Sequence, residues 1–379
     1  MKVLLALLLA LAATATLAHK PSDSYLAINV EGAVVRGQWD IALRDLEFAI
    51  GLDADGNGEI TWGELRAKRS EIEAYAFARL KVGSDGRTCA AAGREFLVDE
   101  HSDGSYAVLR FGADCGAPEG RTATAPTAIE VNYSLFFDLD PTHRGLLRFE
   151  RGGTAQTGVL SPERPRLVFK AGETSALSQF ADYLREGVWH IWIGFDHILF
   201  LLSLLLPCVL ILKGNTWSPA ERFRDTFWDV FKVVTSFTIA HSITLSLAAL
   251  SVISLPSRLV ESIIALSVVL AALNNLKPVV AERRWAVAFA FGLIHGFGFA
   301  SVLADLGLPQ GALLLALVGF NLGVEVGQIA IVAVFLPFAF ALRGHWIYRR
   351  LVFAGGSAAI ALVAAVWFAE RALDVKLWS

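Results

Sequence analysis

The sequence predicts a membrane protein in which a bundle of six helical spans follows an exported, mostly β domain. Charged residues are dense up to about Glu186, and beyond it long apolar runs alternate with short charged loops. Before that point, short segments alternate apolar and polar residues in the manner of strands. With 379 residues, 55% hydrophobic content and a net charge of −3, the chain has room for two or three domains. It has no basic arm or charge run, so we expect no nucleic-acid partner.

Residues 1–18 have the pattern of a secretory signal peptide. Lys2 supplies the positive start, an apolar core follows, and Thr16–Ala18 resembles a small-residue cleavage site. The alternative is an uncleaved anchor, for which the apolar run is short. Cleavage would leave His19 first, and its amine and imidazole would form a bidentate chelate suited to Cu(II) or Ni(II). One residue supplies few ligands, so His19 without a metal role is the alternative.

Residues 19–172 are predicted to form a β domain with the architecture of a sandwich. Glu31 and Gly32 form a hairpin signal between the first two predicted strands. Cys89 and Cys115 both lie in this domain and are candidates for one disulfide in an oxidising compartment. Cys208 lies in an apolar run and is interpreted as a buried small hydrophobe. The predicted strands are Tyr25–Val30, Val34–Leu43, Phe96–Asp99, Tyr106–Phe111, Ile129–Phe137, Leu146–Phe149 and Leu167–Phe169.

One segment of this domain, residues 53–64, matches the calcium loop of an EF-hand at every informative position. Flanking helices are predicted over Asp45–Leu52 and Trp62–Leu80. The alternative is a surface turn rich in aspartate and glycine. We expect a bound calcium ion that acts as a structural clamp. The predicted ligands are the side-chain oxygens of Asp53, Asp55, Asn57, Thr61 and Glu64 and the backbone carbonyl of Glu59, with Gly58 at the sharp turn.

An amphipathic helix is predicted over residues 175–187, followed by a six-span domain at 188–369 and a tail at 370–379. A helical span needs about 20 predominantly apolar residues. Nine Lys and Arg residues fall in loops on one side and three on the other. The positive-inside rule then predicts a bacterial inner-membrane protein with its β domain and C-terminus in the periplasm. The predicted spans are 188–212, 229–252, 259–280, 285–304, 312–341 and 350–369.

The first span, Trp189–Leu212, carries His190, Asp196 and His197 within an apolar run. Ionisable groups at membrane depth are costly and usually functional. On one continuous helix, the two histidines lie seven residues apart and so share one face. Asp196 would lie about 100° from His197, where it can either bind a metal or orient a ligand.

Four other spans carry nitrogen and oxygen ligands at compatible depths: His241, Glu261, His295, Asn321 and Glu325. Each alone is explained by hydrogen bonding between helices, and the glycines near Glu325 by close helix packing. Their coincidence in depth is better explained by a shared metal or proton site facing the periplasm.

The spans resemble the HupE/UreJ family of nickel/cobalt permeases, in particular its longer members with an exported N-terminal domain. The resemblance covers residues 188–369 and implies that His190, Asp196 and His197 take part in metal transport. A second family motif, His-Gly-x-(Ala/Val)-His-Gly-x-Glu, is incomplete here, because Phe291 and Gly298 replace its first His and its Glu. The resemblance therefore gives a transporter class but not the metal. The motifs that carry it are His190–His197, Ser236–Thr244, Glu261–Ser267, Phe291–Ala300 and Phe320–Gln328.

The expected function is secondary transport of a divalent transition metal, with nickel or cobalt first and copper or zinc as alternatives. No P-loop motif indicates ATP hydrolysis, and we expect no enzymatic activity. Two alternatives stay open: an intramembrane zinc hydrolase, and a haem-binding redox or assembly protein with two axial histidines. The lipid bilayer and the metal are the expected partners, and the sequence leaves the oligomeric state open.

Overall fold

The computed structural model describes residues 22–377, apart from residues 33, 102–103, 116–124, 171–175, 215, 281, 299–309, 374 and 376. The chain divides after Asp182 into two compact units, here called the β unit and the helical unit. The predicted signal peptide and His19 lie outside the described residues.

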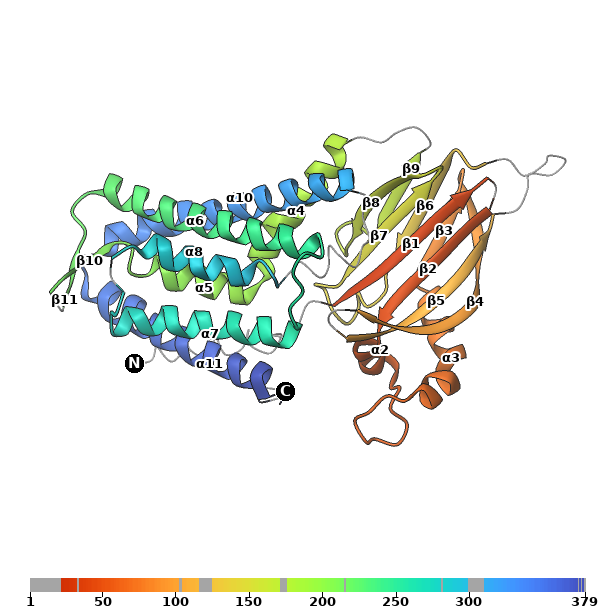
Figure 1. Ribbon diagram of the computed structural model, residues 1–379, viewed down its shortest axis with the longest axis horizontal. Helices are drawn as coiled ribbons and strands as arrows, with labels where there is room; N and C mark the ends of the chain where they lie inside the picture. The colour runs from red at the N-terminus through yellow and green to blue at the C-terminus, as the bar shows by residue number, and fades with distance from the viewer. Residues whose placement is uncertain are drawn as a thin grey trace. The chain divides into compact units, whose positions relative to one another are not determined.

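The β unit contains a nine-stranded sheet with the order β8-β7-β1-β2-β5-β4-β3-β6-β9 (Figure 1). The predicted hairpin is present, with β1 and β2 paired antiparallel. Only the pair of β1 and β7 is parallel among the pairs described. The strands are β1 (Asp23–Glu31), β2 (Val34–Ala42), β3 (Leu80–Ser84), β4 (Arg87–His101), β5 (Gly104–Asp114), β6 (Ala128–Tyr133), β7 (Arg144–Arg151), β8 (Thr154–Leu160) and β9 (Arg166–Lys170).

The sheet folds back on itself, so that its two ends enclose the core as in a sandwich. The ring of Phe149 in β7 stacks on Phe169 in β9 at 4.6 Å, and Trp39 in β2 contacts Tyr133 in β6 at 5.6 Å. The long strand β4 makes the turn between the two layers, because its start pairs with β3 and its remainder with β5. The change falls between Cys89 and Ala90, and a β-bulge between Gly93 and Glu95 follows within the pairing with β5.

Two helices flank the acidic loop: α2 (Leu43–Ile50) and α3 (Trp62–Phe77). Helix α3 begins with a capping box, in which Thr61 and Glu64 each accept a hydrogen bond from the other's backbone N–H. The predicted second helix is three residues too long, because Leu80 already begins β3.

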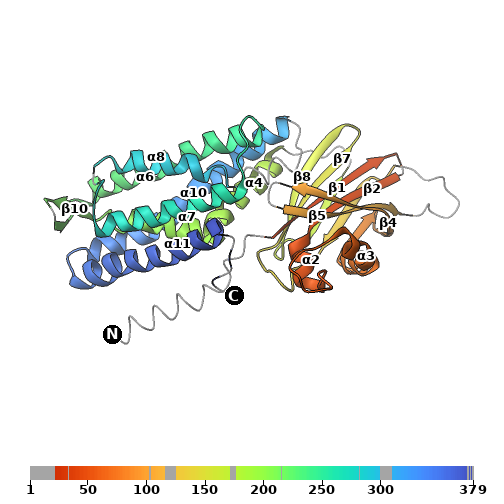
Figure 2. The same ribbon diagram turned by 60° about the horizontal axis from the view of Figure 1, so that its bottom comes forward.

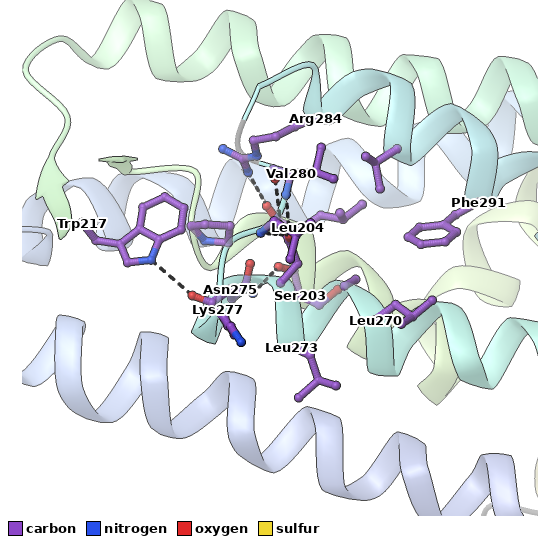
Figure 3. A pocket seen from close by; sticks show the side chains of 15 residues that line it. Ser203, Leu204, Trp217, Leu270, Leu273, Asn275, Lys277, Val280, Arg284 and Phe291 are labelled. Carbon is purple, nitrogen blue, oxygen red and sulfur yellow. Dashed lines mark hydrogen bonds between the residues drawn. The ribbon is translucent and has the colours of Figure 1, made fainter. Parts of the chain in front are cut away.

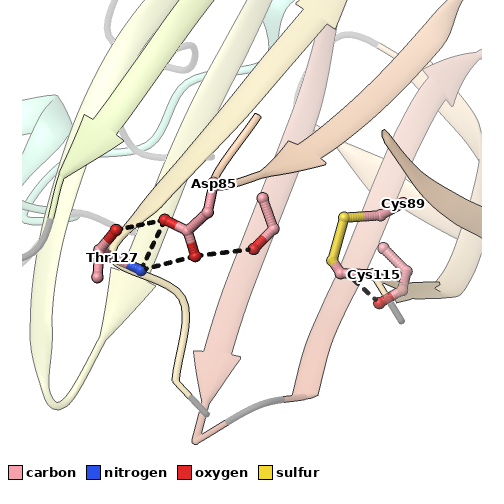
Figure 4. Close-up of a disulfide and its surroundings, with 6 residues drawn as sticks. Asp85, Cys89, Cys115 and Thr127 are labelled. Carbon is pink, nitrogen blue, oxygen red and sulfur yellow. Dashed lines mark hydrogen bonds between the residues drawn. A yellow bond between two sulfur atoms is a disulfide. The ribbon is translucent and has the colours of Figure 1, made fainter. Parts of the chain in front are cut away.

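A disulfide between Cys89 and Cys115 joins the start of β4 to the residue that follows β5 (Figure 4). Close to it, the carboxylate of Asp85 accepts hydrogen bonds from the backbone N–H groups of Thr127 and Ala128. The hydrogen bond from the Thr127 hydroxyl and those from the backbone lower the pKa of Asp85, and burial opposes them without reversing the shift. These two links flank residues 116–124 on either side.

Four helices of the helical unit are long and apolar enough to cross a membrane among the described residues: Phe223–Ala249, Ser257–Leu276, Leu313–Leu342 and Ile347–Leu373. A bent pair, α4 and α5, passes the same test when its two helices are taken together, which makes up to five spans. Figures 1 and 2 show these helices lying roughly along one another. The elements are α4 (Ala176–Ile193), α5 (Phe195–Leu205), β10 (Leu210–Lys213), β11 (Thr216–Pro219), α6 (Phe223–Ala249), α7 (Ser257–Leu276), α8 (Arg284–His295), α10 (Gln310–Leu342), a π-helical segment (Ile347–Gly355) and α11 (Gly356–Leu373).

The first predicted span is wrong as a single helix. It is broken at Gly194 with a bend of 72° between α4 and α5. Helix α5 ends at Leu205, and the apolar residues after Pro207 form the hairpin of β10 and β11 instead. The predicted helix at 175–187 is not separate, because α4 runs on to Ile193. The fourth predicted span is present only as the 12-residue helix α8, and residues 299–309 lie outside the described residues.

Glycines set the distances between the helices that carry the candidate site. A Cβ atom on Gly323 of α10 would lie 2.0 Å from the Leu184 carbonyl oxygen of α4. One on Gly296 would lie 2.1 Å from Thr244 Oγ1 of α6. Such approaches are open only to glycine, and they bring α4 against α10 and α8 against α6.

Candidate metal site

The break at Gly194 brings the two histidines of the first predicted motif together. Gly194 N–H donates to the His190 carbonyl at 3.1 Å, and its own carbonyl accepts from Ile198 N–H at 3.0 Å. The ring centroids of His190 and His197 are 4.5 Å apart. The two residues meet because the chain bends between them, and not because they share one face of a continuous helix. A Cβ atom at Gly194 would lie 2.6 Å from the His190 carbonyl oxygen and 2.9 Å from His197 Nδ1.

The carboxylate of Asp196 contacts the imidazole of His197 and orients it. Its Oδ1 is 3.2 Å from His197 Nδ1, and its Oδ2 is 3.5 Å from Arg371 Nη2. The carboxylate fixes the ring proton on Nδ1, which leaves Nε2 with its lone pair. Arg371 also donates to the Glu261 backbone carbonyl at 3.4 Å. Sequence reasoning assigned Arg371 to the tail after the last span, and no local pattern indicates its role.

His295 lies beside His197, with ring centroids 5.6 Å apart. Its Nε2 is 2.9 Å from Ser267 Oγ, and this hydroxyl donates its proton to the Ile264 carbonyl at 2.6 Å. Since a hydroxyl has one proton, Ser267 accepts from His295, and the ring proton lies on Nε2. The lone pair of His295 is therefore on Nδ1.

His241 on α6 is oriented in the same way by Asn321 on α10. Asn321 donates from its amide to the Leu317 carbonyl at 2.8 Å, so its oxygen faces His241 Nδ1 at 3.2 Å. The ring proton then lies on Nδ1 and the lone pair on Nε2. Asn321 is thus placed as an orienting group for a ligand.

Three imidazole lone pairs are left buried without a hydrogen-bond partner among the described residues: His197 Nε2, His241 Nε2 and His295 Nδ1. His241 and His295 are each 1% exposed. Buried polar atoms in proteins are nearly always paired, so three such nitrogens in one helical unit require an explanation. A metal cation accepts these lone pairs, and the orienting groups described above are those typical of metal-binding histidines.

Two other polar residues of α10, Glu325 and Gln328, bond to side chains of α6. Glu325 accepts a hydrogen bond from Thr235 of α6 at 3.0 Å, and Gln328 pairs with Thr238 of the same helix. In the described part of this unit, no three histidine or carboxylate ligand atoms lie within 4.8 Å of one another. The described histidines and carboxylates of this unit therefore do not form a closed coordination sphere of three such ligands.

A second candidate site lies in the loop between α2 and α3. One oxygen each of Asp53, Asp55 and Glu64 lie within 4.8 Å of one another. Asp53 Oδ2 accepts from Gly58 N–H at 2.8 Å, and Glu64 Oε2 accepts from Thr61 N–H at 2.8 Å. These backbone hydrogen bonds lower the pKa of both exposed carboxyls. Of the other predicted ligands, Asn57 accepts from Glu59 N–H.

The model of one protein family, described as "HupE / UreJ protein", matches residues 166–371 of the chain. The match covers the described helical unit and the last strand of the β unit. A comparison with curated proteins finds no match.

Proposed function

The chain belongs to the HupE/UreJ family, and from this and its buried histidines we propose that it is a secondary transporter of a divalent transition-metal ion. The observation that carries the proposal is the set of three buried, oriented imidazole lone pairs without hydrogen-bond partners among the described residues. Neutral imidazole binds nickel, cobalt, copper and zinc. The family resemblance favours nickel or cobalt as cargo. Protons compete for the same nitrogens, which offers a route to proton coupling.

The spacing of the rings favours transport over permanent retention. A structural zinc site gathers about four ligands in one tetrahedral shell, whereas no three histidine or carboxylate ligand atoms in the described part of this unit lie within 4.8 Å of one another. Conduction requires binding that is strong enough for entry and weak enough for exit, often at several sites in series. The positive-inside pattern supports an inner-membrane orientation in which Lys277 and Arg284 lie on the cytoplasmic side.

The transport proposal is tested by His197→Ala in proteoliposomes, with nickel, cobalt, copper, zinc and manganese offered in turn. We expect uptake of one metal by the wild type and a loss of at least about tenfold in the variant, since even outer groups of a metal site contribute tenfold or more. His345→Ala is the matched control, because His345 lies exposed in the same unit and is not one of the histidines of the candidate site. Metal that stays bound without flux in the wild type would contradict the proposal and favour the hydrolase.

We also propose that the loop of residues 53–64 binds calcium. The helix–loop–helix arrangement and the convergence of three carboxylates support it. The helices α2 and α3 contribute Leu46, Leu65 and Ile72 to the core of the β unit, so an ion in the loop would clamp this corner of the unit.

Glu64→Gln is expected to weaken calcium binding at least about tenfold, because it removes the charged bidentate ligand of the twelfth loop position. Glu59→Gln removes the same charge from the same loop, but there only the backbone carbonyl is expected to bind. Isothermal titration calorimetry of both variants separates a specific ligand from general loop charge. Equal weakening in the two variants would argue against the EF-hand arrangement.

A further inference from the structure

A cavity of about 470 Å³ lies in the helical unit (Figure 3). Its walls are mostly apolar and include Leu270 and Phe291, with Ser203 and Asn275 as polar members. Two cations, Lys277 and Arg284, also line it. Arg284 is fixed there by the Leu204 carbonyl at 2.7 Å and by Asp229 at 3.3 Å.

The cavity and the histidine site lie between one and two helical turns apart along three helices. On α5, Ser203 lines the cavity six residues after His197. On α8, Phe291 lines it four residues before His295. On α7, Ala271 lines it four residues after Ser267, which bonds His295. One turn of helix advances about 5.4 Å, so on α8 the cavity begins about one turn from His295.

Three phenylalanines fill the space between them. The ring of Phe200 is 4.6 Å from His295 and 5.7 Å from Phe291, which lines the cavity. Phe237 contacts both Phe200 at 5.3 Å and His295 at 5.3 Å. Phe200 and Phe237 are 3% and 2% exposed. Such a packed apolar layer excludes water, and a hydrated dication cannot enter it without losing its hydration.

We propose that Phe200, Phe237 and Phe291 form a hydrophobic gate, and that the cavity behind it receives the metal ion released by the histidines. This inference rests on the transport function proposed above. Release of the ion requires that the metal bind more weakly in the cavity than at the histidines, and the residues on the two sides of the gate differ in this direction. On one side imidazole lone pairs hold a cation, and on the other the lining offers no carboxylate or imidazole to bind it, while Lys277 adds a positive charge. An ion that passes the rings therefore leaves the cavity without being retained.

The gate is tested first by thiol accessibility, which requires no transport. Ala271 lines the cavity, and in an Ala271→Cys, Cys208→Ser background the new cysteine is the one reactive thiol of the described residues, since Cys89 and Cys115 are bonded. In sealed proteoliposomes of the full chain, a membrane-impermeant thiosulfonate should label it from the cavity side alone. Adding Phe291→Ala should also open it to reagent from the opposite side. Phe338→Ala on α10 is the control, because Phe338 is 69% exposed and lies outside the gate.

Metal flux gives the second measurement. Phe291→Ala should raise downhill flux about tenfold, as expected if the barrier falls by about 1.4 kcal/mol, and Phe291→Leu should give a smaller rise with less disturbance of packing. Labelling from both sides while Phe291 is intact, no labelling from either side, or a Phe291→Ala protein that behaves like Phe338→Ala would overturn the gate. If the wild type carries no metal but Phe291→Ala still makes the cysteine accessible from the second side, the phenylalanines form a barrier and the proposed transport function is wrong.

Discussion

Gly194→Ala is expected to abolish metal transport while leaving the protein folded. The added methyl group would lie 2.6 Å from the His190 carbonyl oxygen and 2.9 Å from His197 Nδ1. Both are far inside van der Waals contact, and one of them is a backbone atom that cannot rotate away. Relief of the clash requires α4 and α5 to change their 72° bend, which separates His190 from His197. We expect uptake to fall at least about a hundredfold, since misplacement of a functional group by about 1 Å has effects of this size.

Uptake into proteoliposomes and metal binding by titration measure this effect. Gly344→Ala is the matched control, because a Cβ atom there meets nothing within 4 Å. Circular dichroism and the thermal midpoint confirm that the variant is folded. A folded Gly194→Ala protein that transports at the wild-type rate would show that the bend is not needed to present the histidines.

Hydropathy predicted where the helical unit begins and most of its helices, but not the break within the first apolar run. Every residue of the run from Ile198 to Leu212 except Ser203 and Pro207 is apolar or cysteine, and hydropathy does not separate one continuous spanning helix from a shorter helix followed by a hairpin. Pro207 and the β-branched residues that follow it were the available signals of a helix end. In the β unit, β3, β8 and the start of β4 were not predicted, and for β4 the reason is that Arg87–Glu95 has no apolar alternation.

The histidines of the candidate site stand out in the sequence, whereas some of the side chains that orient them do not. His197, His241 and His295 stand out because imidazoles are costly at membrane depth. Their partners Ser267 and Arg371 do not, since a serine in a helix commonly bonds its own backbone and an arginine at a helix end resembles a tail residue. Which residues meet depends on the packing of α5, α7, α8 and α11, and this packing is not encoded in any local pattern. Glu325 looked equally costly, yet the structure gives it Thr235 as a partner.

A fall in pH from 7 to 5 is expected to destabilise the β unit through one buried histidine. His143 is 0% exposed. It belongs to a series of hydrogen bonds in which donor and acceptor can be assigned at each step. Ser22 donates to Asp45 at 2.7 Å and therefore accepts from His143 Nδ1 at 2.5 Å. The other nitrogen, Nε2, then accepts from the Tyr133 hydroxyl at 2.5 Å. This series of hydrogen bonds requires neutral His143, because a proton on its Nε2 would point at the hydroxyl proton that Tyr133 donates to the same nitrogen.

Burial first, and then the positive charges of Arg144 and Arg44, lower the pKa of His143 to about 3. In the unfolded chain a histidine has a pKa of about 6.5, so between these values the unfolded state binds more protons. Stability therefore falls as the pH is lowered through this window. From pH 7 to pH 5 the loss is about 2 kcal/mol for one such group. Asp45, whose pKa burial raises, acts in the opposite direction, because folding favours its protonated form.

Hydrogen exchange of β1 and β7 in the full-length protein measures this loss, because it reports on the β unit without interference from the helical unit. His143→Gln keeps a side chain that can donate to Ser22 and accept from Tyr133 but cannot be protonated. We expect the variant to be less stable than the wild type at pH 7 and to lose less stability on acidification. An equal slope in both proteins would mean that other groups cause the pH dependence, with the carboxyls of the β unit as the remaining source.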